Sequence, residues 1–203
     1  MKLYYSPGAC SLATHIVLRE LDLTFELERV DTATGRTETG ADFRTINPKG
    51  YVAALQLDDG QILTESAALL QYVADLRPKA GLAPQGGLAR ARLQEQLNFT
   101  ASELHKAFGP LFDPTTSPEG RQAAVARVSD RLDYYEALLS DDRPYLLGQT
   151  YSVADAHLFV VAGWAGPSGF GLERWPRLKA HGERIAGRPA VRAAMAAEGL
   201  LSA

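Results

Sequence analysis

The sequence predicts an α/β domain followed by an all-helical domain. Apolar residues with alternating and with helical spacing succeed one another over residues 1–77. A stretch with prolines and glycines interrupts both patterns over 78–88, and only helical spacing is found over 89–203. These segments are therefore predicted as a strand-and-helix domain, a linker and a helical domain. At 203 residues the chain is long enough to bury a full core.

The first domain is predicted to alternate strands with helices and to end on a hairpin and a helix. The turn cluster Ser6-Pro7-Gly8 ends the first strand, and Ser11 begins the first helix. Asp58-Asp59-Gly60, between two β-prone runs, is a strong hairpin signal. The predicted elements are strands over 2–5, 25–30, 51–57 and 61–63, and helices from Ser11, over 42–46 and over 65–76.

The second domain is predicted to contain helices only. Ser152-Val153-Ala154-Asp155 is a capping box, in which the Ser152 hydroxyl and the Asp155 carboxylate satisfy amides at a helix start. The helix that it begins lies in the least charged stretch, 153–171, and is predicted to be the buried centre of the domain. The predicted helices cover about 89–112 and 120–140, begin at Ser152, and lie near 178–186 and 191–198.

Composition excludes several classes of protein. Lys plus Arg number 21 and Asp plus Glu 24, so the basic excess of a duplex nucleic-acid binder is missing. The single cysteine excludes an intrachain disulfide framework and a zinc site built from several thiolates. The first residues lack the apolar region of a secretory signal, and 153–171 is too interrupted to span a bilayer. We therefore expect a soluble cytoplasmic protein with no metal, nucleic-acid or membrane partner.

The single cysteine, Cys10, lies where the first strand gives way to the first helix. The unpaired amides and the dipole of a helix start favour a thiolate, and such positions lower the pKa of a cysteine. Cys10 is therefore a candidate reactive thiol, with a small buried apolar residue as the alternative. Because position 7 is proline, the chain has no C-x-x-C motif, and dithiol cycling within one chain is excluded.

Two further groups of polar residues are candidate binding residues. Glu65 and Ser66 enter the helix after the last strand, where Ser66 can hold a carboxylate and Glu65 an ammonium group. Together they suit an amino-acid head group, or else they only cap the helix. Asn98, Ser102 and His105 form a polar stripe on the first helix of the second domain, which is either part of a site or a solvated face.

Taken together, these residues resemble the bacterial, beta-class glutathione S-transferases over nearly the whole chain. Each motif is only moderately specific, but their order and spacing are highly specific. The resemblance implies a thioredoxin-like N-terminal domain and an all-α C-terminal domain, with glutathione as co-substrate. The motifs are MKLYYSPGACSLATHIVLRE, INPKGYVAALQLDDG, LTESAALLQYVADL, LNFTASELHK and YSVADAHLF.

The resemblance also implies a role for each matching position. The catalytic positions are the thiol of Cys10, its neighbour Ser11, and His105, with Lys106 beside it. The binding positions are Val52 for the cysteinyl backbone, Glu65 and Ser66 for the γ-glutamyl end, Asn98 and Glu103 for the same end across a dimer interface, and Arg36 for the glycine carboxylate. His105 and Lys106 are expected near Cys10 and are expected, with the helix start, to lower its pKa.

The implied function is a detoxifying glutathione transferase, active as a homodimer on an electrophilic small molecule. A cysteine sulfur is a weak hydrogen-bond donor. Cys10 therefore suits thiol–disulfide exchange better than stabilisation of a glutathione thiolate, and we expect modest conjugation. A glutathione-dependent reductase, peroxidase or dehalogenase is an alternative enzyme, and a binding or regulatory module on the same fold is an alternative from another class.

One position departs from the pattern of the fold. Ala53 stands where thioredoxin-like domains normally carry a cis-proline that turns the preceding backbone toward the ligand. A cis bond costs about 0.5–1 kcal/mol before proline but about 2.5–4 kcal/mol before another residue. We therefore expect a trans Val52–Ala53 bond, and with it a lower affinity for glutathione than in relatives that carry the proline.

Overall fold

The computed structural model describes residues 1–201, which divide into two compact units. The first unit combines Met1–Ala80 with the chain from Gly187 onward, and the second is Gly81–Ala186. Each is described here by itself. Within residues 1–201, no helix is both long and apolar enough to cross a membrane.

A five-stranded sheet forms the centre of the first unit, in the order β3-β2-β1-β4-β5. β1 pairs in parallel with β2, whereas β4 pairs antiparallel with both β1 and β5. The hairpin and the predicted strands are confirmed, except that the strand predicted over 51–57 is limited to β4, and the residues 51–53 before it are a loop. The short strand β3 was missed, because two residues in a polar stretch carry no alternation. The bounds are β1 Lys2–Tyr5, β2 Glu26–Asp31, β3 Arg36–Thr37, β4 Ala54–Gln56 and β5 Ile62–Thr64.

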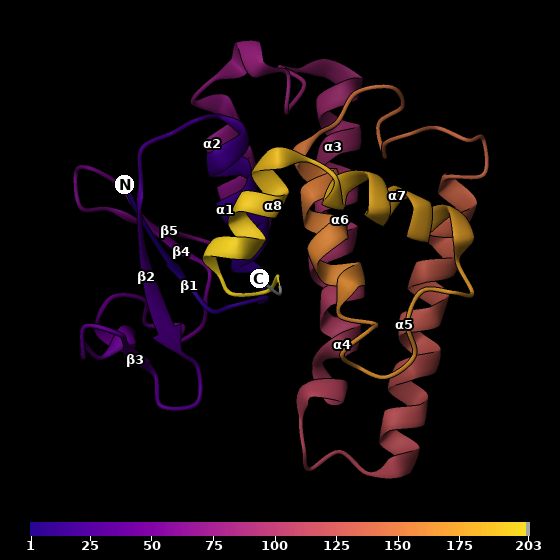
Figure 1. Cartoon of the computed structure of the whole chain (residues 1–203), viewed down its shortest axis with the longest axis horizontal. Helices are drawn as coiled ribbons and strands as arrows, with labels where there is room; N and C mark the ends of the chain where they lie inside the picture. Colours follow the sequence, from indigo (N-terminus) through magenta and orange to yellow (C-terminus); the bar gives the residue numbers. More distant parts are fainter. Residues whose placement is uncertain (202–203) are drawn as a thin grey trace. The chain divides into compact units, whose positions relative to one another are not determined.

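Helices of the first unit lie on one side of this sheet (Figure 1). They are α1 Ser11–Glu20, α2 Ser66–Asp75 and α8 Pro189–Ala197, and short 3₁₀ turns cover Phe43–Thr45 and Pro78–Ala80. α1 packs against both α2 and α8. Because α1 carries eight buried residues in sequence, Ser11 to Leu18, it is covered on all sides, by the sheet and by the other two helices.

The C-terminal segment departs from the predicted domain boundaries. We expected it in the helical domain, but α8 packs on α1 and belongs to the first unit. Hydrogen bonds to a buried carboxylate hold it there: Glu198 accepts from the Gly8 amide at 3.0 Å and from His15 Nδ1 at 2.8 Å. Arg19 donates to His15 Nε2 at 2.8 Å, so the proton of the ring lies on Nδ1. The end of the chain is thereby tied to the loop that precedes Cys10.

The second unit is helical throughout, as predicted, but its first long helix is interrupted. A π-helical turn over Thr100–Leu104 separates α3 from α4. The Thr100 hydroxyl donates to the Gln96 carbonyl at 2.9 Å and also bonds the Tyr135 hydroxyl at 2.7 Å. Single π-helical turns within α-helices are frequent at functional sites. The bounds are α3 Gly87–Phe99, α4 His105–Phe112, α5 Pro118–Leu138, α6 Val153–Gly163 and α7 Pro176–Ala186, with α4 and α5 side by side (Figure 1).

α6 is the buried centre of the second unit, as its low charge predicted. The predicted capping box is confirmed, and the Asp155 carboxylate accepts from both the amide and the hydroxyl of Ser152 at 2.8 Å. Its other oxygen accepts from the Leu146 amide at 2.8 Å and bonds His181 Nε2 at 2.9 Å. One fully buried carboxylate thus connects the loop before α6 with α7.

Candidate active site

Three chain segments of the first unit meet at the thiol of Cys10. Cys10 itself is the N-cap of α1, directly after the loop that follows β1, and is only 8% exposed. Its thiol donates to the Val52 carbonyl, just before β4, with a sulfur–oxygen distance of 3.5 Å. The side chain of Ser66, the first residue of α2, lies close enough to the thiol to favour its charged form. The structure therefore brings together three of the predicted site residues, Cys10, Val52 and Ser66.

The electrostatics of Cys10 differ from the prediction. Burial raises the pKa of its thiol, because desolvation disfavours the charged thiolate. The Ser66 hydroxyl and the backbone N–H groups of Ala53, Cys10 and Ser11 favour the thiolate, but burial outweighs them. The expectation of a lowered pKa was therefore wrong. The sequence indicates the hydrogen-bond donors at the helix start, but it does not indicate how deeply the sulfur is buried.

Ser11 acts on the loop that precedes the cysteine. Its hydroxyl accepts from the Ser6 amide and donates to the Ser6 carbonyl, both at 3.3 Å, and the residue is fully buried. Gly8, within the same loop, has a φ of 71°. A residue with a Cβ adopts that conformation only under strain. Ser11 is thus a positioning residue that closes the loop and fixes where α1 begins.

The Val52–Ala53 peptide bond is cis, so the expectation of a trans bond was wrong. Both residues are buried, at 7% and 3% exposure. Val52 packs in a core cluster with Tyr4, Val30 and Phe43. The prediction compared only the local costs of the two isomers and could not include this surrounding packing. The Val52 carbonyl faces Cys10 and accepts the hydrogen bond of its thiol.

Glu65 lies beside Ser66 but has contacts that the sequence did not reveal. Its Oε1 accepts from Lys49 Nζ at 2.6 Å and from the Tyr51 hydroxyl at 3.0 Å. Lys49 Nζ also donates to the Thr64 hydroxyl at 2.9 Å. The predicted strand 51–57 hid this arrangement, because β4 begins only at Ala54 and the preceding residues form a loop. Lys49 and Tyr51 are therefore candidate site residues that sequence reasoning missed.

The structure does not bring Arg36 together with the residues around Cys10. It lies in β3, at the sheet edge opposite β5, and its guanidinium donates to the Gly40 carbonyl at 2.9 Å. Its expected contact with a glycine carboxylate stays a prediction.

The remaining predicted site residues belong to the second unit, around its π-helical turn. The Asn98 carbonyl accepts from the Ser102 hydroxyl at 2.9 Å, and Glu103 pairs with Arg131 at 2.9 Å. The His105 ring packs edge-on against Trp164, with 4.8 Å between centroids. Lys106 follows it at the start of α4. Because the backbone passes from a π to an α turn here, the predicted stripe of Asn98, Ser102 and His105 does not keep regular α-helical spacing.

Family models match both units. The glutathione S-transferase N-terminal domain matches residues 8–76, and the glutathione S-transferase C-terminal domain matches residues 99–189. Glutathione S-transferase GstA of Escherichia coli O157:H7 is 45% identical over 201 residues, which cover 98% of this chain and 100% of that protein. The chain belongs to the glutathione S-transferase family.

Similar solved structures indicate which class of the family the chain belongs to. The bacterial transferase BphK, in a ternary complex, is 52% identical with a TM-score of 0.96, over 98% of this chain and 100% of that one. The beta-class enzyme of Sphingomonas chungbukensis is 50% identical with a TM-score of 0.95, over 99% of this chain and 100% of that one. A sphingomonad transferase in complex with glutathione gives the same values. The predicted beta-class membership, enzyme class and fold are confirmed.

The raised pKa of Cys10 has a direct consequence for its reactivity. The rate of alkylation should rise with pH through a midpoint above the free-thiol value of about 8.5, since only the thiolate attacks the reagent. The reaction can be followed with iodoacetamide, and in the described residues Cys10 is the free thiol that reports it. A midpoint below 8.5 would show that the donors outweigh burial.

Proposed function

We propose that this transferase holds glutathione at the site formed by Cys10, Val52, Glu65 and Ser66. The hydroxyl and amide of Ser66, at the start of α2, bind the γ-glutamyl carboxylate, and Glu65 binds the ammonium group beside it. The Val52 backbone pairs with the cysteinyl residue of the peptide. The observation that carries this proposal is that three chain segments meet at the Cys10 thiol. Their polar groups can bind the carboxylate and the ammonium of an amino-acid head group close to this sulfur.

Conjugation in this site uses the sulfur of glutathione as the nucleophile, and the chain's own residues favour its thiolate. Because the pKa of Cys10 is raised, its side chain is a neutral thiol at neutral pH. A neutral thiol can donate a hydrogen bond to a thiolate beside it, but a weak one. This supports modest conjugation of an electrophile.

Thiol–disulfide exchange is the second reaction that we propose for the site. The Cys10 thiolate attacks the glutathione sulfur of a disulfide R–S–S–G, forms the Cys10–S–S–G bond and releases the thiolate of R. A glutathione thiolate then attacks that glutathione sulfur, which yields oxidised glutathione and restores the Cys10 thiolate. Both steps are ordinary exchange reactions through a mixed disulfide. The proposal rests on a free cysteine located where the co-substrate sulfur is expected.

Roles for the remaining predicted residues are proposed on the resemblance. Arg36 binds the glycine carboxylate, Asn98 and Glu103 the γ-glutamyl end, and His105 and Lys106 act beside the reacting sulfur. Within the second unit, exposed Phe112 and half-buried Trp164 pack at 5.4 Å between centroids. We propose that an electrophile with an apolar ring packs on such aromatic side chains, and that the enzyme detoxifies electrophiles in the cytoplasm.

We also propose a homodimer of two 22.0 kDa chains. Large apolar side chains exposed on the surface support it: Tyr72 on α2 is 36% exposed, Leu76 just after α2 is 40% exposed, and Leu88 on α3 is 73% exposed. Burying such side chains against a second copy is favourable. Light scattering at micromolar concentration should give twice the chain mass, and a mass near 22.0 kDa would contradict the dimer.

The binding role of Ser66 gives the most direct test of the proposed site. Ser66→Ala should weaken glutathione binding by about 1–3 kcal/mol, the scale of losing a hydrogen bond to a charged group. Isothermal calorimetry measures this loss. Ser140→Ala is the matched control, since Ser140 is an exposed serine just after α5 and should bind glutathione like the unchanged protein. Equal affinity for both variants would remove Ser66 from the site.

A further inference from the structure

Glu65, which receives the ammonium group of the ligand in the proposed function, already holds an ammonium group of this chain. Lys49 Nζ lies 2.6 Å from Glu65 Oε1, and it also donates to the Thr64 hydroxyl at 2.9 Å. The Tyr51 hydroxyl donates to the same Oε1 at 3.0 Å. The loop before β4 and the end of β5 therefore place a cation where the α-ammonium of a γ-glutamyl group is expected.

The two cations are chemically equivalent. A lysine side chain and an α-amino group each end in an ammonium with N–H donors and no acceptor. Each favours the same carboxylate oxygens, and two such charges on one carboxylate repel each other. The lysine therefore either leaves Glu65 when the ligand arrives or weakens the ligand's contact with it.

The ion pair between Lys49 and Glu65 is exposed enough for Lys49 to be displaced from the carboxylate. The two side chains are 45% and 55% exposed, so water can solvate the lysine once it is displaced. Exposed ion pairs contribute little to stability, and a lysine stem is flexible. The backbone of Glu65 is set by its place between β5 and α2, as the residue that begins the helix. The raised pKa of Lys49, caused mainly by its hydrogen bond to Glu65, keeps this competitor charged at neutral pH.

We propose that Lys49 is an internal competitor for the ammonium position of the glutathione site, and that it sets how strongly the enzyme prefers ligands with a free α-ammonium. This inference rests on the proposed function of the site. It assigns Lys49 to specificity rather than to catalysis, because its ammonium contacts Glu65 and Thr64 and not the Cys10 sulfur.

A thermodynamic cycle isolates the competition. The two probes are glutathione and its analogue with a glutaryl group in place of the γ-glutamyl group, which lacks only the ammonium. Calorimetry gives the ratio of the two dissociation constants, analogue over glutathione, for the unchanged protein and for Lys49→Met. The analogue carries one net negative charge more than glutathione, so a general effect of the lost lysine charge also changes the ratio. The same Lys49 substitution made in a Glu65→Gln background measures that general effect separately.

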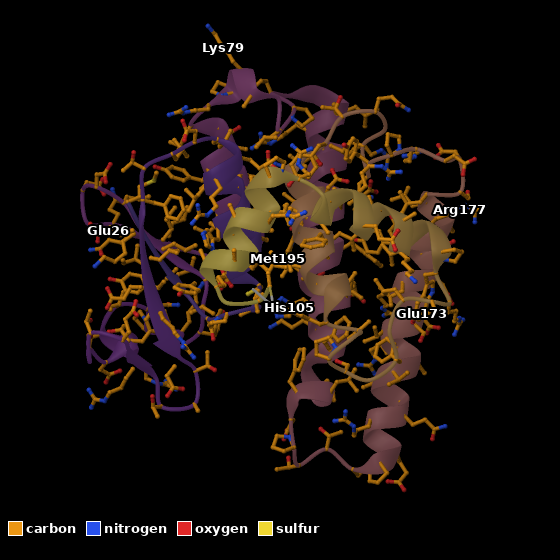
Figure 2. All side chains as sticks on the ribbon, viewed as in Figure 1. Glu26, Lys79, His105, Glu173, Arg177 and Met195 are labelled. Atoms are coloured by element: carbon orange, nitrogen blue, oxygen red, sulfur yellow. The ribbon has the colours of Figure 1, made fainter. Side chains whose placement is uncertain are left out.

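The ratio should rise about two- to fivefold in Lys49→Met, the range that an exposed ion pair can account for. Lys49→Gln should give the same rise. Lys79→Met is the matched control, because Lys79 projects from the ribbon (Figure 2) in the turn Pro78–Ala80, beyond the end of α2, whereas Glu65 and Ser66 lie at its start. Its ratio should not change. In a Glu65→Gln background, the Lys49 substitution should raise the ratio less, because only the general effect of the lost charge is left.

An unchanged or lower ratio in both Lys49 variants would overturn the inference while leaving the proposed function intact. If both probes bound more weakly by the same factor, the inference would also be overturned, since this result would show that Lys49 attracts the carboxylates of the peptide. If the unchanged protein bound neither probe, the proposed function itself would be wrong and this inference with it.

Discussion

The enclosure of the Cys10 sulfur is the constraint on which the rest of the site depends. The Cys10 residue is only 8% exposed, so its sulfur can be approached only from the few directions that its neighbours leave open. Those neighbours come from the loop after β1, the loop before β4 and the start of α2 after β5. Because β1, β4 and β5 are adjacent in the sheet, their connections meet at one end of it. The topology of the sheet thus creates the contact between residues far apart in sequence.

The loop after β1, which precedes Cys10, also depends on the segment at the end of α8. Gly8 donates to Glu198, and Glu198 in turn bonds His15 on α1. A buried carboxylate that lost these donors would be costly, so the contact and the packing of α8 on α1 stabilise each other. A substitution near Glu198 should therefore be felt at Cys10, although the two residues are far apart in sequence.

Local signals in the sequence were sufficient for much of the fold. The hairpin at Asp58-Asp59-Gly60 and the capping box at Ser152 are set by residues within a few positions, and both are confirmed. Cys10 and Ser66 were singled out because helix starts can be recognised locally. Their proximity in the fold is tertiary, and the resemblance assigned both residues to the glutathione site without predicting that they lie next to each other.

The errors share one physical cause, which is that long-range packing has no local signature. The pKa of Cys10 is raised and not lowered, because the residue is buried. The Val52–Ala53 bond is cis although the local costs favour trans, and Val52 packs in a buried core cluster. Lys49 was missed because its partner Glu65 lies across the hairpin. The π-helical turn was also missed, and its Thr100 hydroxyl bonds Tyr135, which lies far away in sequence on α5.

The central claim is that a buried, mostly protonated Cys10 exchanges disulfides with glutathione. Its most direct test is the intact mass of the protein after incubation with oxidised glutathione over a range of pH. The account predicts one glutathionyl group per chain, formed faster as the pH rises because the thiolate fraction grows, and none in Cys10→Ala. An unmodified wild-type chain across the whole range, or a rate of formation that does not change with pH, would contradict it.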